Sequence, residues 1–204
     1  MTTTGYGMTI PFDGVPLAEQ RDRIVELADL GYTDVWSSEA NGADGFTPLV
    51  LASQWAPSLR LGSAIVPSFT RGPATLAQCV ASLADAAPGR VAFGIGTSSN
   101  VIVERWNDLA FEEPFKRTRD VVRFLRTALT GEKVRQDYDT FSVDGFKLGI
   151  VPAEQPKILV AALRQGMLRM AGREGDGAIV NWLGADDVAR VAPHVHEGGP
   201  DKEI

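Results

Sequence analysis

RVAFGIGTSSNVIVERW, residues 90–106, begins as a strand, because Val91, Phe93 and Ile95 are bulky and apolar. The residues between them are alanine and glycine, and glycine inside a strand often marks a close approach to the backbone. The strand runs into the polar segment 97–100, TSSN, which offers hydroxyls and an amide. Two interpretations are open: a flat apolar face with a polar mouth for a large planar ligand, or a tightly packed core strand that ends in an ordinary turn.

The same pattern of an apolar strand followed by a helix repeats along the chain. Strands are predicted at 7–12, 33–38, 59–67, 90–97, 157–162 and 177–182, and helices at 16–30, 47–55, 73–87, 113–129, 165–173 and 185–195. Near-continuous apolar runs are typical of parallel strands that are covered on both faces. The segment 132–155 alternates instead and contains Asp144-Gly145, which predicts a β-hairpin insertion with its turn at that dipeptide.

A β/α repeat without a G-x-G-x-x-G motif after the first strand favours a TIM (β/α)8 barrel over a dinucleotide-binding fold. A closed barrel needs eight units, and the chain supplies six. We therefore predict an α/β protein with one domain, residues 1–204, as a barrel truncated after the sixth βα unit. The competing interpretation is an open α/β sheet that is complete as given.

Composition limits the function classes. The chain has 204 residues with a net charge of −6, and it has no basic run, which argues against a nucleic-acid surface. Its single cysteine, Cys79, excludes an internal disulfide and fits a reducing compartment. The N-terminus lacks the pattern of a signal peptide, and no apolar run is long enough to cross a membrane. These features predict a cytoplasmic protein without nucleic-acid or membrane partners.

In a barrel, chemistry lies at the carboxyl ends of the strands. No lysine ends a predicted strand, and no His/Asp/Glu cluster does, so neither a Schiff-base enzyme nor a metal site is predicted. His194 and His196 fit the surface near a helix end. Asp13 and Glu39 are the remaining acids, and Glu39 is either functional or an ordinary solvated loop residue. Because the strand ends carry so few acid/base groups, we expect a bound cofactor to carry the chemistry.

A candidate anion site follows the strand that ends at Ala161-Ala162. A helix begins directly afterwards, so the free N–H groups of Gln165, Gly166 and Met167 would face an anion, and Arg164 adds a positive charge. This pattern predicts a phosphate site. A plain β–α turn is the alternative.

The segments LRLGSAIVP (59–67), PATLAQCVASLADAAPGRVAFGIGTSS (73–99) and ILVAA (158–162), with MAGREGDGAIVNW (170–182), resemble the luciferase-like monooxygenase family. The ERW motif and the helix that ends in TGE (130–132) belong to the same ordered set. The chain most resembles the branch that uses the deazaflavin coenzyme F420. The resemblance covers residues 9–195 and implies a bacterial luciferase-like TIM barrel of about 300 residues, in which a coenzyme ring lies over the third and fourth strands.

The resemblance also implies roles for individual residues. A non-proline cis peptide is expected at Ala64–Ile65, behind the ring, and Glu39 matches an aspartate that hydrogen-bonds the ring. The remaining coenzyme-binding positions form two groups, one after the fourth strand and one on the phosphate side: Thr97, Ser98 and Ser99, then Ala161, Ala162, Leu163, Arg164, Gln165, Gly166 and Met167.

The chain departs from the sugar-phosphate dehydrogenases of that branch, which carry a catalytic histidine and glutamate where Ala40 and Ser99 stand here. This difference implies another substrate and leaves Glu39 as the one candidate catalytic residue. The expected function is hydride transfer between F420 and a small organic substrate, in a homodimer as is common in the family. The alternatives are an FMN-dependent monooxygenase of the same fold and a non-catalytic F420- or flavin-binding protein.

Overall fold

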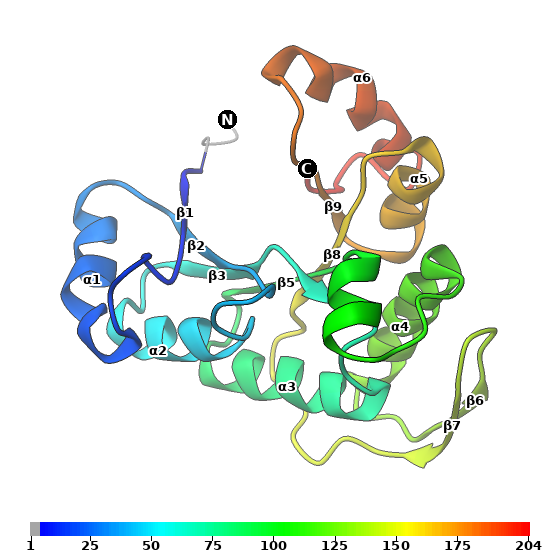
Figure 1. Ribbon diagram of the computed structural model, residues 1–204. Coiled ribbons are helices and arrows are strands. Elements are labelled where there is room, and N and C mark those ends of the chain that lie inside the picture. Colours follow the sequence, from blue (N-terminus) through cyan, green and yellow to red (C-terminus); the bar gives the residue numbers. More distant parts are fainter. Residues whose placement is uncertain (1–4) are drawn as a thin grey trace.

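The computed structural model describes residues 5–204, and its centre is a curled parallel sheet (Figure 1). The sheet has seven strands. Six follow one another in space in the order of the chain: β1 (Gly7–Thr9), β2 (Asp34–Ser37), β3 (Arg60–Ser63), β5 (Val91–Gly96), β8 (Lys157–Ala161) and β9 (Gly177–Ile179). The short strand β4 (Val66–Pro67) pairs with the end of β5. All of these pairings are parallel, as the apolar runs predict.

The helices cover the outer face of the curved sheet (Figure 1). They are α1 (Arg21–Asp29), α2 (Thr47–Trp55), α3 (Pro73–Ala86), α4 (Pro114–Ala128), α5 (Gln165–Glu174) and α6 (Ala185–His196), with a 3-10 turn, η1 (Leu17–Glu19). Proline stands in the first turn of α2, α3 and α4, where its missing N–H costs nothing. A π-helix, η2 (Val101–Trp106), follows β5 and was not predicted.

The hairpin β6 (Val134–Asp137) and β7 (Ser142–Phe146) forms a separate two-stranded antiparallel sheet. The predicted turn at Asp144-Gly145 is wrong, because both residues lie within β7. The chain turns at 138–141, where the Tyr138 N–H donates to the Phe141 carbonyl at 2.8 Å. Gly145 has φ +83°, and the strand register shifts opposite it, so this glycine accommodates a bulge.

Every residue of β5 is buried, and packing explains one of its two glycines. A Cβ at Gly94 would collide with the carbonyl oxygen of Ser63 on β3. The Ser63 hydroxyl also donates to the Gly94 carbonyl at 3.0 Å and accepts from the Gly94 N–H at 2.8 Å. At Gly94 the close approach is therefore made by the neighbouring strand, and only the strand end remains available to a ligand.

The two end strands of the sheet, β1 and β9, do not pair with each other within residues 5–204. Glu203 forms an isolated parallel bridge with Gly177, beside β9. The parallel order and the curl agree with the predicted barrel type and give an open part of such a barrel (Figure 1). Within the described residues, no helix has both the length and the apolar character that crossing a membrane requires.

Candidate active site

A cavity of about 370 Å³ lies where the carboxyl ends of β5, β8 and β9 meet. Ten residues line it: Ile65, Gly96, Thr97, Ser98, Ala161, Ala162, Leu163, Arg164, Met167 and Asn181. Most of them are sequence-predicted positions, although they come from four separate segments of the chain. Parallel strands bring their carboxyl ends to one edge of the sheet, which explains why residues as far apart in the sequence as Ile65 and Asn181 share one cavity.

The apolar floor of this cavity is made by Ile65, Gly96 and Ala161. A Cβ at Gly96 would lie 3.0 Å from the Ala161 Cβ, so these strand ends are in close contact. The peptide bond between Ala64 and Ile65 is cis, which confirms that expectation. The end of β2 and the loop after it hold this peptide on both sides: the Ala64 N–H donates to the Ser37 carbonyl at 2.6 Å, and the Glu39 N–H donates to the Ile65 carbonyl at 3.1 Å.

The polar side of the cavity is the turn after β5. Ser98 adopts a left-handed backbone conformation with φ 62°, which non-glycine residues rarely take. The Thr97 hydroxyl donates to the Ser98 carbonyl at 3.3 Å. Ser99 does not line the cavity; its carbonyl accepts the Val103 N–H at 2.9 Å and so begins η2. Two of the three predicted hydroxyl positions thus face the cavity.

The amino end of α5 forms the second polar element. The N–H groups of Gln165, Gly166 and Met167 have no acceptor within residues 5–204, whereas the Leu168 N–H donates to the Arg164 carbonyl at 3.0 Å. A Cβ at Gly166 would have no atom within 4 Å, so the space beside this turn is open. Arg164 is exposed and forms no ion pair with the described residues. Free N–H groups, a helix dipole and a free cation together suit an anion.

Glu39 lies outside this cavity, and its carboxylate already has three donors. Oε2 accepts the Gly45 N–H at 2.9 Å, while Oε1 accepts the Thr70 hydroxyl at 3.2 Å and Arg71 Nη1 at 2.5 Å. Burial lowers the pKa of Arg71, but the contact with Glu39 outweighs it and raises that pKa. The side chain of Glu39 ties the loop after β2 to the loop after β4, and a direct contact with a ring stays a prediction.

Asn181 was missed as a site residue, although it stands two residues after the end of β9. The next residue, Trp182, has φ 58° and is 93% exposed. Of the other predicted positions, Ala64 lines a separate cavity with Trp36 and Arg60. The sequence signal that could have found Asn181 was its place at a strand end.

The fold and the cavity define a class: an α/β barrel-type protein with a candidate ligand cavity at the carboxyl ends of parallel strands. The model of the family described as luciferase-like monooxygenase matches residues 2–202, so the chain belongs to this family.

Several relatives are at least 30% identical to the chain, and two of them show how far the match extends. The 5,10-methylenetetrahydromethanopterin reductase of Archaeoglobus fulgidus is 30% identical over 159 residues, which are 77% of this chain and 47% of that protein. The F420-dependent glucose-6-phosphate dehydrogenase of Gordonia bronchialis is 34% identical over 152 residues, which are 69% of this chain and 44% of that protein. The chain therefore spans about half the length of the curated relatives it matches.

Among solved structures, an F420-dependent secondary alcohol dehydrogenase in complex with an F420-acetone adduct aligns with a TM-score of 0.86. The alignment covers 97% of this chain and 64% of that one, at 19% sequence identity. At this identity the likeness establishes the fold.

Proposed function

We propose that this protein is an F420-dependent oxidoreductase that transfers a hydride between the deazaflavin coenzyme and a small organic substrate. The family supports this proposal, because the two relatives named above include an enzyme whose name states F420 dependence. The single observation that carries it is the shared cavity of Ile65, Thr97, Ser98, Ala161 and Arg164, which joins a flat apolar floor to an anion site. A planar ring would match the apolar floor, and an anionic tail would match the anion site.

The cavity fits such a coenzyme in size and in its donors. A volume of about 370 Å³ lies within the range of small-molecule sites, roughly 300–1,000 Å³. Ile65, Gly96 and Ala161 would support the ring, and the Thr97 and Ser98 hydroxyls would meet its polar edge. The unpaired N–H groups of α5 and the Arg164 guanidinium would hold a phosphate. When bound, the coenzyme supplies the carbon that gives or takes the hydride.

The residues that line the cavity then contribute binding and orientation rather than proton transfer. Arg164 is the only side chain with a formal charge that lines the cavity within residues 5–204, and it is a binding group. Glu39 keeps its predicted role as the candidate catalytic residue, which would require its carboxylate to leave Gly45 or Arg71. The hydride-transferring coenzyme would carry the chemical step itself, as is general for such enzymes.

The partners of this proposed enzyme are the coenzyme, a small-molecule substrate and a second copy of the chain. Homodimer formation through the helices beside β2 and β3 is a proposal from the family resemblance. A cytoplasmic location is likewise a proposal, supported by one cysteine and an acidic surface.

Fluorescence titration of the purified protein with oxidised F420 tests the function, with FMN titrated in parallel. We expect saturable binding of F420, weaker binding of FMN, and reduction of bound F420 by some member of an alcohol and aldehyde panel. Tight binding of FMN alone would instead identify a flavin monooxygenase. Binding of F420 without turnover of any substrate would identify a coenzyme-binding protein, and no binding of either would refute the proposal.

A further inference from the structure

A second cavity, of about 380 Å³, lies beside the first on the same rim of the fold. Its walls are the loop after β4, the segment 107–113, the first turn of α4 and the turn of the β6–β7 hairpin. The residues that matter here are Phe69, Leu109, Glu112, Glu113, Arg117 and Asp139. Nothing in the proposed coenzyme site uses this cavity.

Arg117 is the distinctive group in this second cavity. It is half-buried, and its Nε–H donates to the Ser68 carbonyl at 3.2 Å. Its guanidinium lies 4.8 Å from the ring centre of Phe141 and 5.9 Å from that of Phe69. No carboxylate of the described residues pairs with it, and burial lowers its pKa. Arg117 is therefore a cation held by one hydrogen bond and two aromatic rings, and its terminal N–H groups have no acceptor among residues 5–204.

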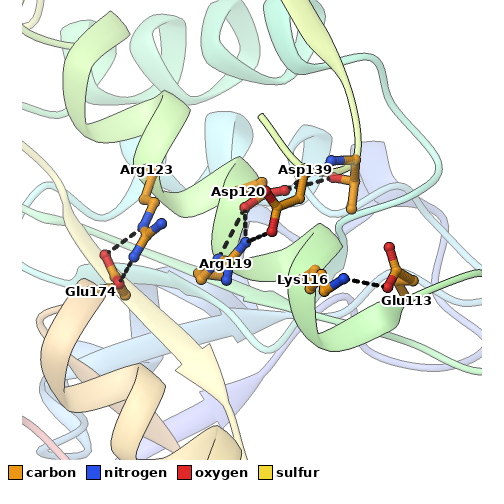
Figure 2. A network of polar contacts seen from close by, with 8 residues as sticks. Glu113, Lys116, Arg119, Asp120, Arg123, Asp139 and Glu174 are labelled. Carbon is orange, nitrogen blue, oxygen red and sulfur yellow. Dashed lines mark hydrogen bonds and ion pairs between the residues drawn. The ribbon is translucent and has the colours of Figure 1, made fainter. Parts of the chain in front are cut away.

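Two acids that line this cavity, Glu113 and Asp139, are occupied by other cations (Figure 2). Glu113 accepts a hydrogen bond from Lys116 at 2.6 Å, and Asp139 accepts one from Arg119 at 2.7 Å. Of the acids that line the cavity, only Glu112 forms no ion pair with residues 5–204. The cavity thus presents one unpaired arginine fork beside one free carboxylate at its edge.

The two cavities have no lining residue in common, but Ser68 connects their walls. Ile65 lines the first cavity and Phe69 the second, and four residues of extended chain span at most about 14 Å. The Ser68 N–H donates to the Gly96 carbonyl at 2.9 Å, so the residue whose carbonyl holds Arg117 is itself fixed to the end of β5. The single residue Ser68 therefore separates Arg117 Nε, in the second cavity, from the Gly96 carbonyl at the first.

We propose that Arg117 binds a carboxylate group of the substrate, whose reacting carbon lies at the first cavity. As a substrate subsite this rests on the proposed function. A planar carboxylate matches the guanidinium fork in a bidentate arrangement, and Phe69 and Leu109 offer apolar contact to the carbon chain next to it. Glu112, Glu113 and Asp139 disfavour a doubly charged phosphate in the same place.

Butyrate is the probe, with neutral butyramide and inorganic phosphate as comparators at constant ionic strength. Binding is followed by the side-chain Nε–H signal of Arg117 in 15N-labelled protein, which is assigned by its loss in Arg117→Gln. Butyrate should bind the wild type saturably. Its affinity for Arg117→Gln should be lower by about tenfold or more, and its affinity for Arg117→Lys should be intermediate. Glu112→Gln, on the exposed edge, should bind butyrate about twofold to threefold more tightly because a repelling charge is removed.

Arg21→Gln is the matched control, since it removes one positive charge from the exposed face of α1 and should leave butyrate binding unchanged. Equal binding of butyrate to the wild type and Arg117→Gln, binding of butyramide, or preference for phosphate would each overturn the proposal. F420 titration of the same variants separates the two proposals. If the wild type does not bind F420, the proposed function alone is refuted. If butyrate binds the wild type and Arg117→Gln equally, the subsite alone is refuted.

Discussion

Arg71 Nη1 lies 2.5 Å from Glu39 Oε1, although the two residues are 32 positions apart in the sequence. Their side chains are only 19% and 13% exposed, so the ion pair is largely removed from water. Arg71 also lies 5.1 Å from the ring centre of Phe46, and Asp44 nearby accepts the N–H groups of Phe46 and Thr47 at the start of α2. The pair fixes two loops whose backbone supports Ile65, at the floor of the candidate coenzyme site.

Glu39→Gln should lower the free energy of unfolding by about 1–3 kcal/mol, because Arg71 would be left half-buried without its counter-charge. Affinity for F420 should change by less than about threefold, since the Glu39 N–H that holds Ile65 is unaffected. Urea unfolding and fluorescence titration measure the two effects. Arg71→Gln in the same background gives a double-mutant cycle that isolates the pair. A loss of coenzyme affinity with unchanged stability would mean that the Glu39 carboxylate contacts the ring instead.

Ser98 combines a hydroxyl that faces the cavity with a left-handed backbone, and two substitutions separate these features. Ser98→Ala and Ser98→Gly should weaken F420 binding equally, by about fivefold to tenfold, because both remove one hydrogen-bonding group. Only Ser98→Gly should raise the free energy of unfolding, by about 0.5–1 kcal/mol, since glycine adopts φ 62° without strain. Weaker binding in the glycine variant alone would point to backbone order rather than the hydroxyl.

The two glycines Gly94 and Gly166 should respond oppositely to alanine. Gly94→Ala should destabilise the fold by at least about 2 kcal/mol, because its Cβ would meet the Ser63 carbonyl oxygen in the buried sheet. Gly166→Ala should leave stability unchanged or raise it by about 0.5 kcal/mol, since its Cβ meets nothing within 4 Å. Thermal unfolding compares them. Destabilisation by Gly166→Ala would show that this turn is packed rather than open.

Local sequence signals predicted most of the fold because they act over a few residues. The helix predicted at 47–55 is confirmed as α2, since Pro48 and Pro57 mark its two ends. Parallel topology then explains why Thr97, Ser98 and the segment 161–167 were predicted to meet, and the structure brings most of them into one cavity. The hairpin turn was misplaced because a glycine with positive φ serves a bulge as well as a turn.

Long-range pairs were beyond the sequence signals. The partner of Glu39 is Arg71, and the carbonyl that holds Arg117 belongs to Ser68, 49 residues earlier in the chain. Neither contact leaves a periodic pattern, because each depends on how two loops pack after the strands pair. For the same reason Glu39 was predicted at a ring, whereas its three hydrogen bonds in the structure are to two neighbouring loops.

Glu203 should make stability depend on pH at the acidic end. Burial raises the pKa of this carboxyl, but hydrogen bonds from Arg60 and Lys157 outweigh it and hold the pKa below its ordinary value of 4.5. The unfolded chain therefore binds this proton at a higher pH than the folded chain does. The stabilisation is present above about pH 4.5 and is lost as the pH falls through the lower folded value.

Glu203→Gln should thus cost about 1 kcal/mol at pH 7, a modest value because the side chain is 31% exposed and screened by solvent. The difference in unfolding free energy between the wild type and Glu203→Gln should shrink as the pH is lowered from 6 to 3, since protonation removes the same charge. Glu132→Gln, an exposed acid without an ion pair among the described residues, is the matched control and should show no such convergence. Equal unfolding free energies of the wild type and Glu203→Gln at every pH would mean that Glu203 stabilises the open edge beside β9 through its backbone bridge to Gly177 rather than through its charge.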